Sequence, residues 1–101
     1  MRSKYEIKAQ KELEKYGWTV DNKAGMGRWA VNRDFFNLFD LVAIRKGAEN
    51  VRWISIKGHN SNQRKHRNEI AKLPFPKGNI KELWRWPKNK KKKEWIKEVI
   101  T

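Results

Sequence analysis

Two apolar segments joined by a short polar link constrain the fold of this chain more than any other part of its sequence. Residues 34–44 end in a continuous apolar run, and residues 51–57 are again rich in Val, Ile and Trp. Continuous apolar runs of this length are typical of strands that are buried on both faces. Residues 45–50 are mostly polar and contain Gly47, which indicates a hairpin loop. The sequence therefore predicts a buried antiparallel hairpin.

The ends of this hairpin carry opposite charges. In an antiparallel pair the start of one strand lies beside the end of the next, so we expect Asp40 and Lys57 to be neighbours. Ser55 and Lys57 are two residues apart and are predicted to share a face, with Ile54 and Ile56 on the other. A carboxylate beside an ammonium at a sheet edge has two interpretations. It is a structural ion pair, or it is half of a metal-dependent phosphodiesterase site.

The remaining segments alternate between helical and extended patterns. Residues 94–100 fit either pattern, and the turn signal before them favours a strand. The other predicted elements are a helix at 3–16, a strand at 18–20, a helix at 62–72 and a strand at 80–86. The resulting order, α-β-β-β-α-β-β, predicts one α/β domain over residues 1–101, with a mixed central sheet and a helix on each face.

Local signals set the ends of the two helices. The apolar stripe of the first helix runs to Tyr16, and Gly17 directly after it is typical of a helix end. Glu6 is at the edge of this stripe and is expected at the rim of the packed surface. A Ser or Asn within residues 58–61 is predicted to cap the second helix. The cation-rich start of that helix opposes its dipole, which indicates either a bound anion or solvated surface charge.

The net charge of the chain limits the kinds of partner that it is expected to bind. The chain has 25 Lys and Arg against 11 Asp and Glu, for a net charge of +14, and 12% of its residues are aromatic. An excess of this size points to a polyanion, most commonly a nucleic acid, and less to an anionic membrane. No cysteine is present, which excludes a disulfide scaffold and a thiolate zinc site. No apolar run is long enough for a membrane span, so a cytoplasmic location is expected.

Basic and polar residues outside the hairpin are the predicted contacts with nucleic acid. Their side chains suit phosphates, and the accompanying aromatic ring suits a base. The predicted contacts are Arg28, Trp29, Arg33, His59, Asn60, Arg64, Lys65, Arg67, Lys90, Lys91, Lys92 and Lys93.

Four segments of the chain resemble the PD-(D/E)XK nuclease superfamily, in particular its small archaeal and phage members that are similar to Holliday-junction resolvases. The resemblance covers roughly residues 4–86. It rests on Glu6, on the junction at residues 16–18, on residues 33–44 with their Asp40, and on Ile54-Ser55-Ile56-Lys57. It implies a restriction-endonuclease-like fold, a homodimer, and Mg²⁺-dependent cleavage of duplex or branched DNA, with Mn²⁺ as a substitute.

The same resemblance assigns roles to individual residues. Asp40, Glu6 and the backbone carbonyl of Ile56 would bind the metal, and Lys57 would be catalytic. The position of Ser55 is the one at which the family carries Glu, Asp or Gln, so this chain has a degenerate (D/E)-x-K motif. A hydroxyl is a poorer Mg²⁺ ligand than a carboxylate.

The departure at Ser55 leaves several functions open. Glu69 on the following helix or Asp34 upstream of Asp40 could supply the missing carboxylate. Otherwise the fold would bind nucleic acid without cutting it. A small RNA-binding or ribosome-associated protein is a third hypothesis, although the sequence has no RRM, KH or zinc-finger signature.

Overall fold

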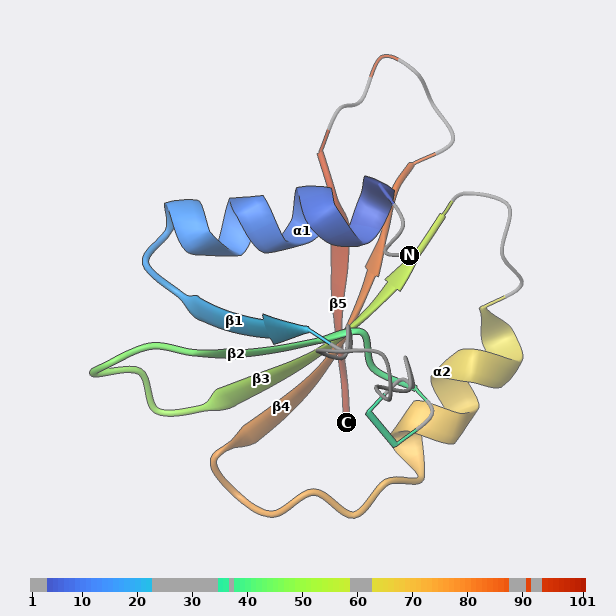
Figure 1. Cartoon of the computed structure of the whole chain (residues 1–101). Coiled ribbons are helices and arrows are strands. Elements are labelled where there is room, and N and C mark those ends of the chain that lie inside the picture. The colour runs from blue at the N-terminus through green and yellow to red at the C-terminus, as the bar shows by residue number, and fades with distance from the viewer. Residues whose placement is uncertain (1–3, 23–34, 37, 59–62, 88–90, 92–93) are drawn as a thin grey trace, which may run out of the picture.

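The computed structural model of the chain is a five-stranded sheet between two helices (Figure 1). It describes residues 4–22, 35–36, 38–58, 63–87, 91 and 94–101. The elements are α1 (Lys4–Lys15), β1 (Thr19–Asn22), β2 (Leu41–Ile44), β3 (Val51–Lys57), α2 (Arg64–Ala71), β4 (Asn79–Arg85) and β5 (Ile96–Ile100). This order and the mixed α/β class confirm the prediction, including the strand at the end of the chain.

The strands lie side by side in sequence order, β1-β2-β3-β4-β5. Neighbours are antiparallel except β3 and β4, which are parallel and joined through α2. A parallel pair needs a crossover connection of this kind, because both strands must run in the same direction. The carboxyl ends of β3 and β4 therefore meet at one edge of the sheet, with Lys57 beside Arg85.

Each helix covers its own apolar core on one face of the sheet. Under α1, Ala9 and Leu13 pack with Ile54, Ile56 and other buried residues. On the other face, Ile70 of α2 packs with a second cluster that consists of Leu38, Phe39, Leu83 and Ile100. Successive side chains of a strand point to opposite faces, so β3 contributes to both cores. None of the described helices is long and apolar enough to cross a membrane.

The end of α1 follows the sequence signal at Gly17. Gly17 has φ +89°, and its N–H donates to the Glu14 carbonyl at 3.1 Å. The Trp18 N–H donates to the Leu13 carbonyl at 3.1 Å. These two bonds form a Schellman motif, which favours glycine because of the positive φ. Tyr16, expected in the apolar stripe, is 61% exposed because it follows the last helical turn.

The start of α2 differs from the prediction. The helix begins at Arg64, two residues later than expected, and Gln63 occupies the N-cap position without a side-chain hydrogen bond. The predicted cap by Ser or Asn is therefore wrong. At the other end, the buried Lys81 ammonium of β4 donates to the carbonyls of Ile70, Ala71 and Leu73 at 2.9 to 3.3 Å. This cation adds a charged donor to the carbonyls at and just after the end of α2, of which Ile70 and Leu73 also accept backbone N–H groups.

Candidate functional site

Asp40 lies one residue before β2 and is held against β3. Its N–H donates to the Ile54 carbonyl at 2.9 Å, and its Oδ2 accepts the Ile56 N–H at 2.7 Å. The residue is 5% exposed. The carboxylate thus takes the place of a strand carbonyl, and the structure brings Asp40 to the segment that ends at Lys57. The resemblance implies that the Ile56 carbonyl binds a metal. In the structure, the contact between Ile56 and Asp40 is made by the Ile56 N–H.

Ser55 faces α2, and its hydroxyl has a partner there. The residue is fully buried, and a hydrogen bond of 2.6 Å joins Ser55 Oγ to His66 Nε2. The alternation of β3 predicts this inward direction, since Ile54 and Ile56 lie in the core under α1. The four-residue spacing of His66 and Ile70 places both on one helix face and predicts a packing role for His66. Its hydrogen bond to Ser55 was not predicted.

The other predicted acids have different environments. Glu6 is 7% exposed, buried rather than at the rim, and belongs to α1 on the face of Ile54 and Ile56. Glu69 is exposed on the outer side of α2. The structure therefore does not bring Glu69 to the Ser55–His66 pair, and Asp34 lies outside the described residues.

The positions of these side chains determine whether they could bind the predicted metal ion. Within the ranges that the structure describes, no group of three or more His, Cys, Asp or Glu could hold an ion. The Ser55 hydroxyl is neutral and bonded to His66, and Asp40 already accepts the Ile56 N–H. A hard cation such as Mg²⁺ needs several oxygen ligands, usually with at least one or two carboxylates. As placed, Ser55 and Glu69 therefore do not complete a site for Mg²⁺ or Mn²⁺ with Asp40.

The carboxyl ends of β3 and β4 place two cations side by side. Lys57 is opposite Arg85 in the parallel register, and both side chains are half-buried. Neither side chain forms an ion pair with any residue in the described part of the chain. Like charges on adjacent strands repel each other unless an anion lies between them. Arg85 was not predicted as part of the site, because only the crossover register places it beside Lys57.

The predicted nucleic-acid contacts have different environments. Arg64 and Lys65 are exposed on α2, and Lys91 is exposed between β4 and β5. Arg67 forms a bidentate ion pair with Glu98 of β5 at 2.7 and 2.8 Å. The hydrogen bond to Glu98 raises the pKa of the Arg67 guanidinium above its ordinary value. The contacts outside the described residues are Arg28, Trp29, Arg33, His59, Asn60, Lys90, Lys92 and Lys93.

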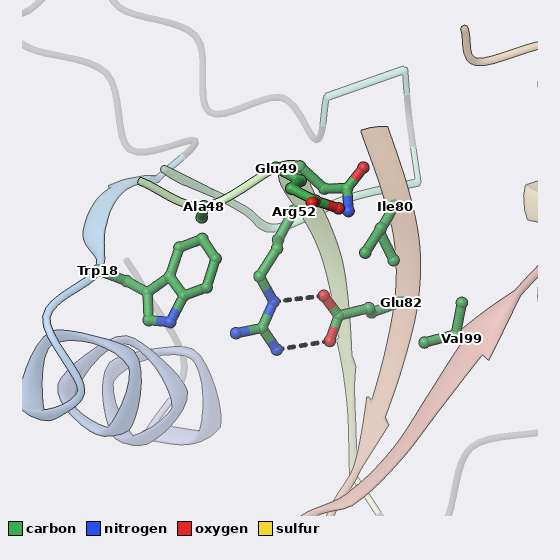
Figure 2. Close-up of a pocket in the computed structure, with 8 residues that line it drawn as sticks. Trp18, Ala48, Glu49, Arg52, Ile80, Glu82 and Val99 are labelled. Carbon is green, nitrogen blue, oxygen red and sulfur yellow. Dashed lines mark hydrogen bonds and ion pairs between the residues drawn. The ribbon is translucent and has the colours of Figure 1, made fainter. Parts of the chain in front are cut away.

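A depression of about 300 Å³ lies beside β3 and β4, near the β2–β3 loop (Figure 2). Its floor is the ion pair of Arg52 with Glu82, at 2.6 and 2.7 Å, and Glu82 also accepts the Trp84 indole N–H at 3.0 Å. The Arg52 guanidinium lies 4.7 Å from the centre of the Trp18 ring. Because the polar groups of Arg52 and Glu82 pair with each other, we interpret this depression as structural.

Comparison of the chain with protein-family models, with curated proteins and with solved structures finds no match. The geometry of the described residues is therefore the basis for the function proposed below.

Proposed function

We propose that this chain binds the sugar–phosphate backbone of DNA at the edge where β3 and β4 end. The observation that carries this proposal is the pair of adjacent cations, Lys57 and Arg85. An ammonium and a guanidinium with no acidic partner among the described residues are well suited to phosphate oxygens. The crevice at the carboxyl ends of parallel strands is also a common place for ligands in open α/β sheets.

The charge of the whole chain supports the same partner. A net charge of +14 on 101 residues attracts a polyanion over a distance set by the ionic strength. Each cation that neutralises a phosphate releases counterions, so binding should weaken steeply as salt is added.

The architecture supports a restriction-endonuclease-like fold as part of this proposal. The element order, the parallel β3–β4 pair and the position of Asp40 against Ile56 agree with what the resemblance to resolvases implies. On that resemblance we propose a homodimer that binds duplex or branched DNA.

Mg²⁺-dependent cleavage of DNA is a second candidate. The position of Asp40 favours it, because this carboxylate is bonded to Ile56, the residue before Lys57. Cleavage would require further acidic ligands, and Ser55 and Glu69 do not supply them as placed. Binding without cleavage is therefore the function that the described residues support best.

The test is a panel of labelled DNAs (single strand, duplex, flap and four-way junction) incubated with the protein and with Mg²⁺ or Mn²⁺. We expect salt-sensitive binding and intact DNA. Lys57→Gln and Arg85→Gln should each weaken binding and reduce the slope of log K against log salt by about 0.9 on duplex DNA. The matched control Lys46→Gln removes the same charge from the exposed β2–β3 loop.

Two results would count against the proposal. Equal effects of Lys57→Gln, Arg85→Gln and Lys46→Gln would show that binding does not involve the edge of β3 and β4. Metal-dependent cutting that Asp40→Asn abolishes would establish the second candidate.

A further inference from the structure

The outward side of α2 forms a polar surface with an excess of positive charge. Its residues line a shallow depression of about 370 Å³. They are Arg64, Lys65, Asn68, Glu69 and Lys72, and we refer to them as the α2 surface. All five are exposed, and three of them are cations against one acid.

The opposite side of α2 is fixed to the sheet at several points. His66 bonds to Ser55, and Arg67 pairs with Glu98 of β5. Ile70 is fully buried in the core, and Lys81 binds the last carbonyls of the helix. A helix held in this way presents its outer residues in a fixed orientation before any partner arrives. Preorganisation of this kind lowers the cost of binding.

The charge of the α2 surface complements a polyanion. The first turn of α2 has no acidic residue, and the N-cap residue Gln63 makes no side-chain hydrogen bond. The positive end of the helix dipole therefore adds to the charges of Arg64 and Lys65. Lys65 and Lys72 form no ion pair within the described chain.

The dimensions of α2 suit one groove of a nucleic acid. An α-helix such as α2 is about 10–12 Å in diameter with its side chains. The major groove of B-form DNA is about 12 Å wide and accepts a helix. The major groove of A-form RNA is deep and narrow and does not accept one.

We infer that α2 lies in the major groove of duplex DNA, with Lys65 and Lys72 on phosphates and Asn68 at the base edges. This inference rests on the proposed function and adds the element that contacts the bases. The Asn68 amide is the neutral polar group of the α2 surface and, within the described residues, makes no side-chain hydrogen bond. An amide can donate and accept at once, which suits N6 and N7 of adenine.

Two substitutions with opposite expected effects on DNA affinity test the position of α2. Lys72→Gln should weaken binding to a duplex, and Glu69→Gln should strengthen it, because Glu69 would face phosphates that repel its charge. Affinities of the purified variants are measured by fluorescence anisotropy between about 50 and 300 mM NaCl. Over this range the Debye length falls by about twofold or more. Lys46→Gln on the β2–β3 loop is the control for loss of one distant charge.

A third substitution tests base contact. We expect Asn68→Ala to leave the slope of log K against log salt unchanged. Selection from a random duplex pool should show that it relaxes the preference at one base pair by about 5-fold or more, the size of a bidentate base contact. Lys72→Gln should instead reduce the slope by about 0.9 and leave the preferred sequence as it is. Circular dichroism of each variant confirms that the exposed substitution leaves the fold intact.

The outcomes separate this inference from the proposed function. If Lys72→Gln and Glu69→Gln act no differently from Lys46→Gln while Lys57→Gln still weakens binding, α2 lies outside the interface and only the inference fails. An unchanged base preference in Asn68→Ala, or equal α2 dependence on single-stranded DNA or anionic vesicles, also overturns groove insertion. If the wild-type chain binds no nucleic acid, the proposed function itself fails.

Discussion

Asp40 provides both a hydrogen-bond acceptor and a negative charge, and substitutions that remove one or both should differ in their effect on stability. It is 5% exposed, and its carboxylate accepts the buried Ile56 N–H at 2.7 Å. A buried donor that loses its acceptor costs free energy, whatever role the charge has in function. Asn keeps an oxygen acceptor at the same place but removes the charge, whereas Ala removes both.

We therefore expect Asp40→Ala to lower the free energy of unfolding by about 1–3 kcal/mol, and Asp40→Asn to lower it by less. Urea denaturation followed by tryptophan fluorescence measures both values. Equal losses for the two variants would show that the charge of Asp40, and not its bond to Ile56, stabilises the fold.

Phe36 has the single positive φ among the non-glycine residues that the structure describes, at 55°. An L-residue in this left-handed region carries a cost of about 1–2 kcal/mol. The ring is 58% exposed and packs at 5.5 Å on Trp53 and 5.4 Å on Phe75, measured between ring centroids. The lost backbone strain and the lost packing should therefore nearly cancel when Asn, which tolerates this conformation, replaces Phe36.

The expected result for Phe36→Asn is a free energy of unfolding within about 1 kcal/mol of the wild type. Phe36→Val should be more destabilising, because a β-branched side chain is disfavoured at this φ. Phe39→Ala, at a fully buried site, should cost about 3–5 kcal/mol. Thermal and urea denaturation of the three variants provide the comparison, and an Asn variant less stable than the Val variant would contradict the strained conformation.

Sequence analysis predicts the sides of β3 but not all the partners of its residues. Alternation placed Ser55 and Lys57 opposite Ile54 and Ile56, because a strand allows only two directions. Which residue of α2 bonds to Ser55 depends on the rotation of the helix about its axis. The packing of Ile70 with Leu83 of β4 and Ile100 of β5 sets that rotation. A single sequence does not contain that rotation, since it follows from tertiary packing.

At the scale of elements, α2 is the helix whose stability depends most on its neighbours. Its eight residues are too few for an isolated helix in water. The Lys81 ammonium donates to three carbonyls at and just after its end, and the residue is 9% exposed. A cation at this position also interacts favourably with the negative end of the helix dipole.

We expect Lys81→Met to lower the free energy of unfolding by about 1.5–3 kcal/mol, the range for hydrogen bonds to a charged group. The loss should be local, so amide hydrogen exchange should accelerate in α2 more than in β1 and β2. Lys97→Met, which removes a half-exposed lysine of β5, serves as the matched control and should cost about 1 kcal/mol or less. Uniform acceleration across all five strands would contradict a local role for Lys81.

The order of the elements was predictable because the chain alternates clear apolar segments with Gly, Pro and Asn. Gly17 marked the end of α1 because its positive φ is a property of one residue. The start of α2 was not predictable, because Gln63 gives no capping signal. Lys81 appeared as an ordinary strand residue, since nothing local to β4 indicates that the end of a helix lies above it.

At the scale of the whole molecule, the net charge of +14 is a source of instability as well as a means of attraction. Repulsion among the cations is stronger in the folded state than in the extended chain, and salt screens it. The described ion pairs Arg67–Glu98 and Lys97–Glu12 are partly exposed and contribute little in comparison.

The melting temperature should therefore rise by a few degrees as NaCl increases from about 20 to 200 mM, a range over which the Debye length falls about threefold. Differential scanning calorimetry without nucleic acid measures this change. A melting temperature that falls with salt would show that attraction within ion pairs outweighs the net repulsion.

The parallel register of β3 and β4 also has a kinetic consequence. It joins residues 51–57 with residues 79–85, so Lys57 and Arg85 meet only after a long segment has closed. Pairings between such distant segments form late and slowly. A phosphate held by both side chains would bridge the two strands and act as a removable cross-link. Bound DNA should therefore slow unfolding in stopped-flow experiments and leave the folding rate unchanged, because the cross-link forms after the strands have met.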